Sequence, residues 1–267
     1  MQVNANTTIQ PQGLQASEVG NVDAADTPLV RTIAGIAAEC TTFVSLAIRA
    51  SDTHDTAEAD RLEENSDARK KIETSRSHHE SMMRTIQREA ADRANQDAPE
   101  NPIALTLQYA CQQTLKFNTG NCADMTLILG AVLERVLPLR LSAAGLNAED
   151  IERADPQLRC LYNAEDGGNH VVLGLTFTDV DAQTEHQYYA DAWAGGTLIP
   201  HNEARAFYED NQSRYITGNF QFEENEKFSA IMKSPAFVDA ICDTLTRQYD
   251  VRLEAPMPDN PFARYER

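Results

Sequence analysis

The amino-acid sequence predicts an α+β protein whose sheet is antiparallel. Apolar residues recur at helical spacing in the first half of the chain, within residues 29–50 and 103–137. Short apolar segments bounded by turn-forming residues follow between residues 159 and 191, and helical patterns return after residue 203. Helices, then strands, then helices again favour segregated elements over the regular alternation of a parallel α/β fold.

The N-terminal part divides into three stretches of different composition. Residues Met1 to Pro28 are polar, without an aromatic residue or periodicity, which predicts disorder over residues 1–28. Leu29 to Ala50 reads as an amphipathic helix. Ser51 to Glu100 contains no Phe, Trp, Tyr or Val and interleaves opposite charges. This stretch reads as one or two solvated helices or a partly disordered linker, with a partner-binding arm as the alternative. We treat residues 29–100 as a helical, polar extension.

A folded catalytic domain is expected from residue 101 to residue 267, where apolar density, aromatic residues and glycine all increase. Gly120 and Pro138 bracket the most apolar helix, which should be buried and central. The expected helices are Ile103–Phe117, Cys122–Leu137, Glu203–Glu209, Phe228–Met232 and Ala236–Tyr249, and the expected strands are Arg159–Tyr162, His170–Phe177 and His186–Asp191.

Charge and cysteine usage exclude several classes of protein. The formal net charge is −18, which disfavours binding to nucleic acid or to anionic membranes and favours a protein or small-molecule partner. No stretch approaches the roughly 18 uninterrupted apolar residues of a membrane span, and Met1 to Gln10 shows no secretory signal pattern. Five cysteines without C-x-x-C spacing predict free thiols, and no HExxH motif or zinc-ligand spacing indicates a metal or other cofactor.

Cys122 is the candidate nucleophile because of its place at the start of a helix. It follows the turn-like segment Asn118-Thr119-Gly120-Asn121 and opens the apolar helix. A cysteine reacts as the thiolate, which a helix N-terminus and a nearby imidazolium both stabilise. Free N–H groups of the first turn can also hold a developing oxyanion. The other cysteines sit inside helical or strand patterns and read as buried apolar residues: Cys40, Cys111, Cys160 and Cys242.

His170 and Asp191 are the candidate partners of this thiol. His170 opens an apolar strand, and a returning strand ends at Asp191. If the turn 179–182 closes a symmetric hairpin, Thr178 faces Gln183 and His170 faces Asp191. Opposed residues of an antiparallel pair point to the same face, so the carboxylate would hold the imidazole in one tautomer.

These residues carry a resemblance to known thiol enzymes. The segments Gly120-Asn121-Cys122, Asn169-His170-Val171 and Tyr189-Ala190-Asp191-Ala192-Trp193 resemble papain-like and transglutaminase-like enzymes, in which a helix-borne Cys precedes a His and an Asp or Asn on adjacent strands. With its polar N-terminus, the chain is similar to bacterial effector cysteine proteases and glutamine deamidases delivered into host cells. The resemblance spans residues 120–193.

The resemblance implies a papain-like core and a Cys-His-Asp triad that attacks an amide of a partner protein, with a host-cell protein as one candidate. Cys122 would be the nucleophile, His170 the base and Asp191 the residue that orients the base. The backbone N–H of Cys122, with a side chain such as Gln112, Gln113 or Asn121, would stabilise the oxyanion, and Trp193 would shield the site from water.

Three functions remain open from the sequence. The first is hydrolysis of an amide, by glutamine deamidation or proteolysis, and the second is transamidation on the same triad. The third is a non-catalytic protein that binds its partner through the acidic helical arm. The chain is expected to be soluble, and either exported by a type III-like route or cytoplasmic.

Overall fold

The computed structural model describes residues 27–48, 67–97, 102–164, 170–210 and 221–262. The expectations for residues 1–26, for the break at 98–101 and for the Gly-Gly turn before His170 lie outside these ranges. The elements are α1 (Pro28–Ala47), α3 (Asp67–Asp97), α4 (Pro102–Phe117), α5 (Cys122–Ala143), α6 (Ala148–Ala154), β1 (Gln157–Asn163), β2 (Val171–Asp179), β3 (Thr184–Asp191), β4 (Thr197–Pro200), α7 (His201–Asp210), β5 (Phe222–Glu224), α8 (Glu226–Lys233) and α9 (Pro235–Tyr249).

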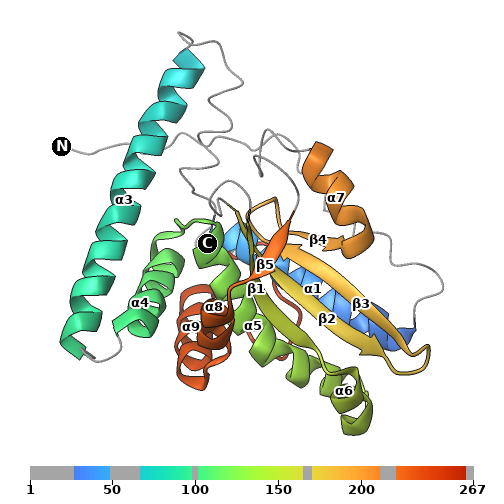
Figure 1. Cartoon of the computed structure of the whole chain (residues 1–267). Helices are drawn as coiled ribbons and strands as arrows, with labels where there is room; N and C mark the ends of the chain where they lie inside the picture. Colours follow the sequence, from blue (N-terminus) through green and yellow to red (C-terminus); the bar gives the residue numbers. More distant parts are fainter. Residues whose placement is uncertain (1–26, 49–66, 98–101, 165–169, 211–220, 263–267) are drawn as a thin grey trace.

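The described strands form one antiparallel sheet in the order β4-β3-β2-β1-β5. Helices α1 and α5 pack on one face, and α1 runs behind β2 and β3 in Figure 1. Helix α7 contacts β3 and β4, and its Tyr208 packs with residues of the opposite face. The expected α+β class with an antiparallel sheet is confirmed.

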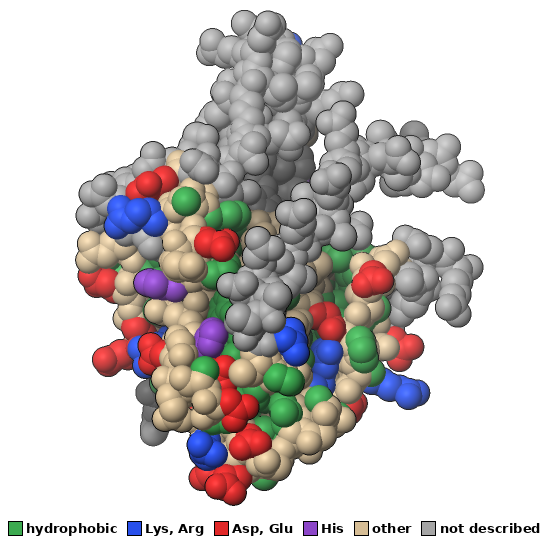
Figure 2. Space-filling model, turned by 90° about the vertical axis from the view of Figure 1, so that its right-hand side faces the viewer, with side chains coloured by type: hydrophobic (Ala, Val, Ile, Leu, Met, Phe, Trp, Pro, Cys, Tyr) green, Lys and Arg blue, Asp and Glu red, His purple; other side chains and the backbone are tan. Residues whose placement is uncertain are grey.

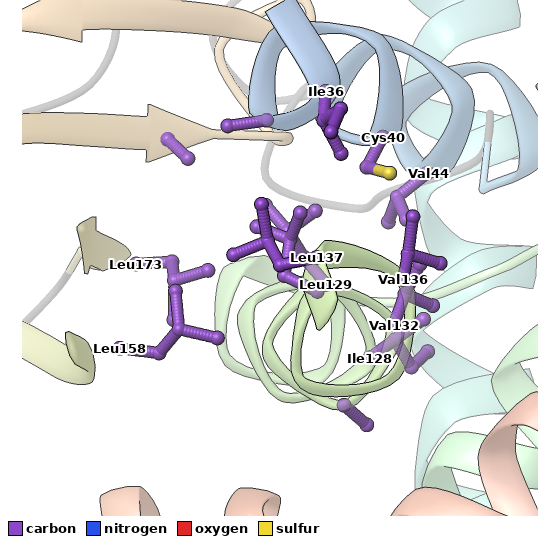
Figure 3. Close-up of a cluster of buried hydrophobic side chains, with 14 of the residues drawn as sticks. Ile36, Cys40, Val44, Ile128, Leu129, Val132, Val136, Leu137, Leu158 and Leu173 are labelled. Carbon is purple, nitrogen blue, oxygen red and sulfur yellow. The ribbon is translucent and has the colours of Figure 1, made fainter. Parts of the chain in front are cut away.

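Alternation along β2 assigns its residues to the two layers. Leu173 joins the large core under α1 and α5, whereas Val172 joins the smaller cluster under α7. This period of two is what a strand covered on both faces requires. Figure 3 shows Leu158 and Leu173 pointing from the sheet toward α5. On the other side of α5, Val132 and Val136 lie near the side chains of α1.

Helix α5 is the central element, and it is longer than expected. The sequence analysis ended it before Pro138 because proline has no N–H to donate to the preceding turn. The helix continues through Pro138 to Ala143. Its last turn is anchored to α1, since the Arg140 guanidinium donates to both carboxylate oxygens of Glu39 at 2.7 and 2.8 Å. Leu141 is also fully buried there, so packing outweighs the lost hydrogen bond.

Helix α1 shares the core of the rest of the fold, although the sequence analysis grouped it with the extension. Ile33, Cys40 and Val44 are fully buried in the same cluster as α5. Among the described residues α1 is the one helix whose length and apolar content would suffice to cross a membrane, and 61% of its most apolar window is buried in the protein. Burial of this kind is what a core helix of a globular protein shows.

Helices α3 and α4 lie side by side, away from the sheet (Figure 1). Met83 and Ile86 of α3 are buried in a small cluster of their own. The Arg93 guanidinium lies 4.1 Å from the centre of the Tyr109 ring, and the Tyr109 hydroxyl donates to Asp97 at 2.6 Å. The described part of the polar segment, residues 67–97, thus forms one long helix that is fixed to α4 by its second half, and the expectation for residues 51–66 lies outside the described ranges.

Candidate active site

The start of α5 is fixed by local hydrogen bonds that the sequence encodes. Asn121 is the N-cap residue: its Oδ1 accepts from the N–H of Asp124 at 3.0 Å, and Asp124 Oδ2 accepts from the N–H of Asn121 at 3.3 Å. Reciprocal capping of this kind sets the first helical residue. That residue is Cys122, so the thiol lies in the first turn, where N–H groups lack helical acceptors.

The turn before Cys122 packs closely against its neighbours. A Cβ atom on Gly120 would come within 2.6 Å of the Thr114 side chain, so glycine is needed there. Asn118 adopts a left-handed conformation with φ of 57°, and its amide donates to the carbonyl of Ala47 at 2.9 Å. These contacts tie the turn to α1 and α4 and fix where the thiol can lie.

The hairpin that carries His170 and Asp191 is shifted by two residues from the expected register. Gly174 pairs with Tyr189 and Thr178 with Glu185, where the sequence analysis paired Thr178 with Gln183. The loop has four residues, as assumed, but it lies one residue later in the chain, at 180–183, because the hairpin closes at the pair Asp179–Thr184. Continued by one pair, this register sets Asp191 opposite Val172, two residues from His170, so the direct pairing of His170 with Asp191 was wrong.

The pair nevertheless meets, because a shift of two residues keeps both side chains on the same face. His170 and Asp191 become diagonal neighbours, whose Cβ atoms lie about 7–8 Å apart in an antiparallel pair and whose long side chains still reach one another. His170 Nε2 lies 2.7 Å from Asp191 Oδ2, and both side chains are 1% exposed. The structure therefore brings together the two residues that the sequence analysis proposed.

A contact between α5 and β2 brings the thiol to this pair. The Thr126 hydroxyl donates to the carbonyl of Val171 at 3.1 Å. Thr126 lies one helical turn after Cys122 on the same face, and Val171 follows His170 directly. The side chain of Cys122 is hydrogen-bonded to His170. Since Nε2 already faces Asp191, Nδ1 is the ring nitrogen left for the thiol.

The charges of the three groups support one another. Burial alone would lower the pKa of His170, but the carboxylate of Asp191 and the hydrogen bonds with Asp191 and Cys122 raise this pKa to about 10. Burial would raise the pKa of Asp191, yet the charge of His170 and three hydrogen bonds hold it below its usual value. The imidazole of His170 is therefore held in its charged form between the carboxylate of Asp191 and the side chain of Cys122.

The Asp191 carboxylate has two further donors. Its Oδ1 accepts from the N–H of Ala194 at 2.9 Å, and its Oδ2 accepts from the Tyr208 hydroxyl at 2.8 Å. A buried carboxylate needs such donors to remain charged. Tyr208 was not found from the sequence, because it belongs to α7 and nothing local marks it as facing the hairpin.

Aromatic rings enclose the imidazole of His170. Trp193 lies nearest, with its ring centre 5.1 Å from that of His170, followed by Tyr208 at 6.0 Å and Phe222 at 6.5 Å. Trp193 is 5% exposed. Trp193, the residue expected to shield the site, therefore packs on the imidazole of His170; Phe222 is a second residue that the sequence did not reveal.

The side chains suggested for the oxyanion site are placed differently. The Gln112 amide donates to the Ala240 carbonyl and the Thr244 hydroxyl of α9, at 3.4 and 3.2 Å, so it is held by that helix. Gln113 is half-buried on α4. Asn121 uses its Oδ1 to cap α5. Because the Asp124 N–H already donates to this Oδ1, the N–H groups of Cys122 and Ala123 are the first-turn donors closest to the thiol in sequence.

Cys122 differs from the other four cysteines in accessibility. It is half-buried, whereas the other four are buried: Cys40, Cys111, Cys160 and Cys242. Burial raises the pKa of Cys160 to about 12 and that of Cys242 to about 11, which keeps them as thiols. Within the part of the chain that the structure describes, no three His, Cys, Asp or Glu side chains gather as metal ligands would.

Comparison with known proteins yielded no match to a family model, to a curated protein or to a solved structure. The geometry of Cys122, His170 and Asp191 is therefore the basis for any functional assignment.

Proposed function

We propose that this protein is a cysteine hydrolase of the papain-like or transglutaminase-like kind, acting on an amide of a partner protein. One observation carries the proposal: a buried His170 is hydrogen-bonded to Asp191 on one side and to Cys122 at a helix N-terminus on the other. A thiol, an imidazole and a carboxylate in this order form the machinery of covalent acyl transfer.

The reaction follows from the roles of these groups. The Cys122 thiolate attacks the carbonyl carbon of the amide, and first-turn N–H groups of α5 stabilise the oxyanion. When the C–N bond breaks, the His170 imidazolium gives its proton to the leaving nitrogen, which departs as ammonia or as an amine. His170, now neutral, takes a proton from water as the water attacks the thioester, and the carboxylic acid leaves with the thiol restored. Asp191 keeps the imidazole oriented throughout.

A protein substrate fits the charge of the molecule. The chain has a net charge of −18, and acidic side chains are scattered over the described part of the face in Figure 2. Such a surface repels phosphate-rich polymers and favours neutral or basic partners. The amide is either the side chain of a glutamine or a peptide bond, and an amine in place of water would give transamidation. The resemblance to bacterial effectors makes a host-cell protein the proposed substrate.

The first experiment measures alkylation of the intact protein by iodoacetamide at pH 6, with the modified residue located by mass spectrometry. We expect one fast site at Cys122 in the wild type, no fast site in Cys122→Ala, and at least tenfold slower labelling in His170→Ala. Cys242→Ala is the matched control, since it removes a buried thiol and should leave the fast site unchanged. Slow labelling that is indifferent to His170 would refute the catalytic assignment and leave the non-catalytic binding protein.

A second assay separates the reaction types once the thiol is shown to be reactive. The wild type and Cys122→Ala are incubated with denatured casein, and ammonia release, peptide cleavage and incorporation of a fluorescent amine are followed. Ammonia without cleavage indicates deamidation, new peptides indicate proteolysis, and incorporated amine indicates transamidation. Each signal must be absent in Cys122→Ala to count.

A further inference from the structure

Tyr208 stands in an unusual place for a residue of a separate helix. Its hydroxyl donates to Asp191 Oδ2 at 2.8 Å, and His170 Nε2 lies 2.7 Å from the same oxygen. The Ala194 N–H binds the other oxygen, Oδ1. Two donors therefore share the one carboxylate oxygen that faces the base, and all three side chains are 1% exposed.

Packing accounts for the ring of Tyr208 and leaves its hydroxyl unexplained. The ring belongs to the apolar cluster under α7, together with Val172 and Ile199. It meets Phe207 edge-on, with ring centres 5.1 Å apart, and Phe222 at 5.5 Å. A phenylalanine would fill this space equally well, so the hydroxyl has a role beyond filling the core.

The physical effect of this hydroxyl has a definite sign. A hydrogen bond to a carboxylate draws negative charge toward its donor and weakens the attraction of that carboxylate for another cation. The groups facing His170 are Asp191 on β3, Cys122 on α5 and Tyr208 on α7, with Trp193 and Phe222 as apolar neighbours. Of these, Asp191 and Cys122 hold the proton on the ring, and Tyr208 opposes the hold of Asp191.

We infer that Tyr208 is a positioning residue that acts through Asp191 to moderate the basicity of His170, so that the imidazolium can give up its proton to the leaving group. This inference rests on the proposed function. A general acid that binds its proton too tightly is a slow donor, because catalysis is most efficient when the proton affinities of donor and acceptor are close to balance. By competing with His170 for Asp191 Oδ2, the Tyr208 hydroxyl lowers the proton affinity of His170 and brings it closer to that of the leaving group.

The test is the titration of His170 in Tyr208→Phe, followed by NMR of ¹⁵N-labelled histidine between pH 7 and 11, with His170→Ala to assign the signal. We expect the midpoint of the His170 titration to rise by about 0.3–1 pH unit, because the variant loses the hydrogen bond from the Tyr208 hydroxyl to the charged Asp191 carboxylate. Tyr189→Phe is the matched control: Tyr189 lies in the same cluster, but its hydroxyl bonds His201 Nδ1 at 2.9 Å. That variant should leave the His170 midpoint unchanged.

An unchanged or lowered midpoint in Tyr208→Phe would overturn the inference, as would an equal rise in Tyr189→Phe. Near-ultraviolet circular dichroism shows whether each variant keeps its packing. Alkylation of Cys122 at pH 6 separates this outcome from the proposed function. If labelling does not depend on His170, the proposed function fails; if it does depend on His170 while the midpoint ignores Tyr208, only the role of Tyr208 fails.

Discussion

The turn after Asp191 offers a sharp test of the packing, because it contains two adjacent glycines in the same backbone conformation. Gly195 has φ of 81° and Gly196 has φ of 76°. A Cβ atom on Gly195 would meet no atom within 4 Å, whereas a Cβ on Gly196 would lie 2.7 Å from Thr42 Cα and 3.0 Å from Ser45 Cβ. Both of these atoms belong to α1. An alanine at either position therefore tests the backbone strain of the left-handed conformation, and an alanine at Gly196 also tests the close approach to α1.

The expected magnitudes follow from these two terms. A left-handed alanine costs about 1–2 kcal/mol relative to glycine, and this applies to both variants. Gly196→Ala must also push the turn away from α1, which adds about 1–3 kcal/mol of overpacking because a helix backbone yields poorly. It also strains the bond from the Thr42 hydroxyl to the Gly196 carbonyl, at 3.1 Å. Gly196→Ala should therefore be less stable than Gly195→Ala by at least about 1 kcal/mol.

Urea unfolding at 25 °C and pH 7 measures the difference, with thermal unfolding as a second readout expected to differ by about 2–4 °C per kcal/mol. The turn also supplies the Ala194 N–H to Asp191. We therefore expect slower alkylation of Cys122 in Gly196→Ala than in Gly195→Ala. Equal free energies of unfolding for the two variants would refute the close contact between this turn and α1.

Two further predictions concern the pH dependence of stability. Burial raises the pKa of Asp124 from 3.8 to about 6 despite its bond to the Asn121 N–H, so the fold loses stability as the pH rises from 3.8 to about 6 and Asp124 becomes charged. Asp124→Asn should therefore raise the free energy of unfolding at pH 7.5 by up to about 3 kcal/mol and leave it unchanged at pH 4. Asp150, at the same position of α6, is more exposed than Asp124, and Asp150→Asn should give no such rise. Because the pKa of His170 is raised from 6.5 to about 10, the stabilising effect of its charged form is complete below pH 6.5 and is lost as the pH rises through 10. The midpoint of urea unfolding should therefore fall between pH 6.5 and 10 in the wild type, and it should fall much less in Asp191→Asn.

The place of Cys122 at the start of a helix could be predicted from the sequence because its setting is local. Asn121 and Asp124 form a capping box that any reader of the sequence can recognise, and the cap defines Cys122 as the first helical residue. The long apolar run after it fixes α5 as the buried helix. The same local reasoning ended the helix too early, because the anchor between Arg140 and Glu39 joins residues far apart in the chain.

The elements that the sequence missed depend on distant contacts. Strands β4 and β5 have four and three residues, too short for a periodic pattern. Each is defined by the strand beside it, since β4 pairs with β3 and β5 with β1. Tyr208 was missed for the same reason: its significance comes from Asp191, which lies on another element.

The register of the hairpin shows why the candidate triad was nevertheless found. The four-residue loop was placed one residue too early, because the ladder closes at Asp179 and Thr184 and Gln183 adopts a left-handed φ of 53°. An error of one residue would have turned Asp191 toward α1 and α5 and away from His170, whereas an error of two left both on the α7 side. Whether the two side chains meet therefore depends on their lying on the same face of the sheet, and a direct pair between the two residues is not required. Trp193 lies in the turn that follows Asp191, and its ring centre is 5.1 Å from that of the His170 imidazole. His170 thus meets a carboxylate at the end of β3 and an apolar wall from the turn that follows it, and both contacts depend on the face of the sheet and not on a direct pair.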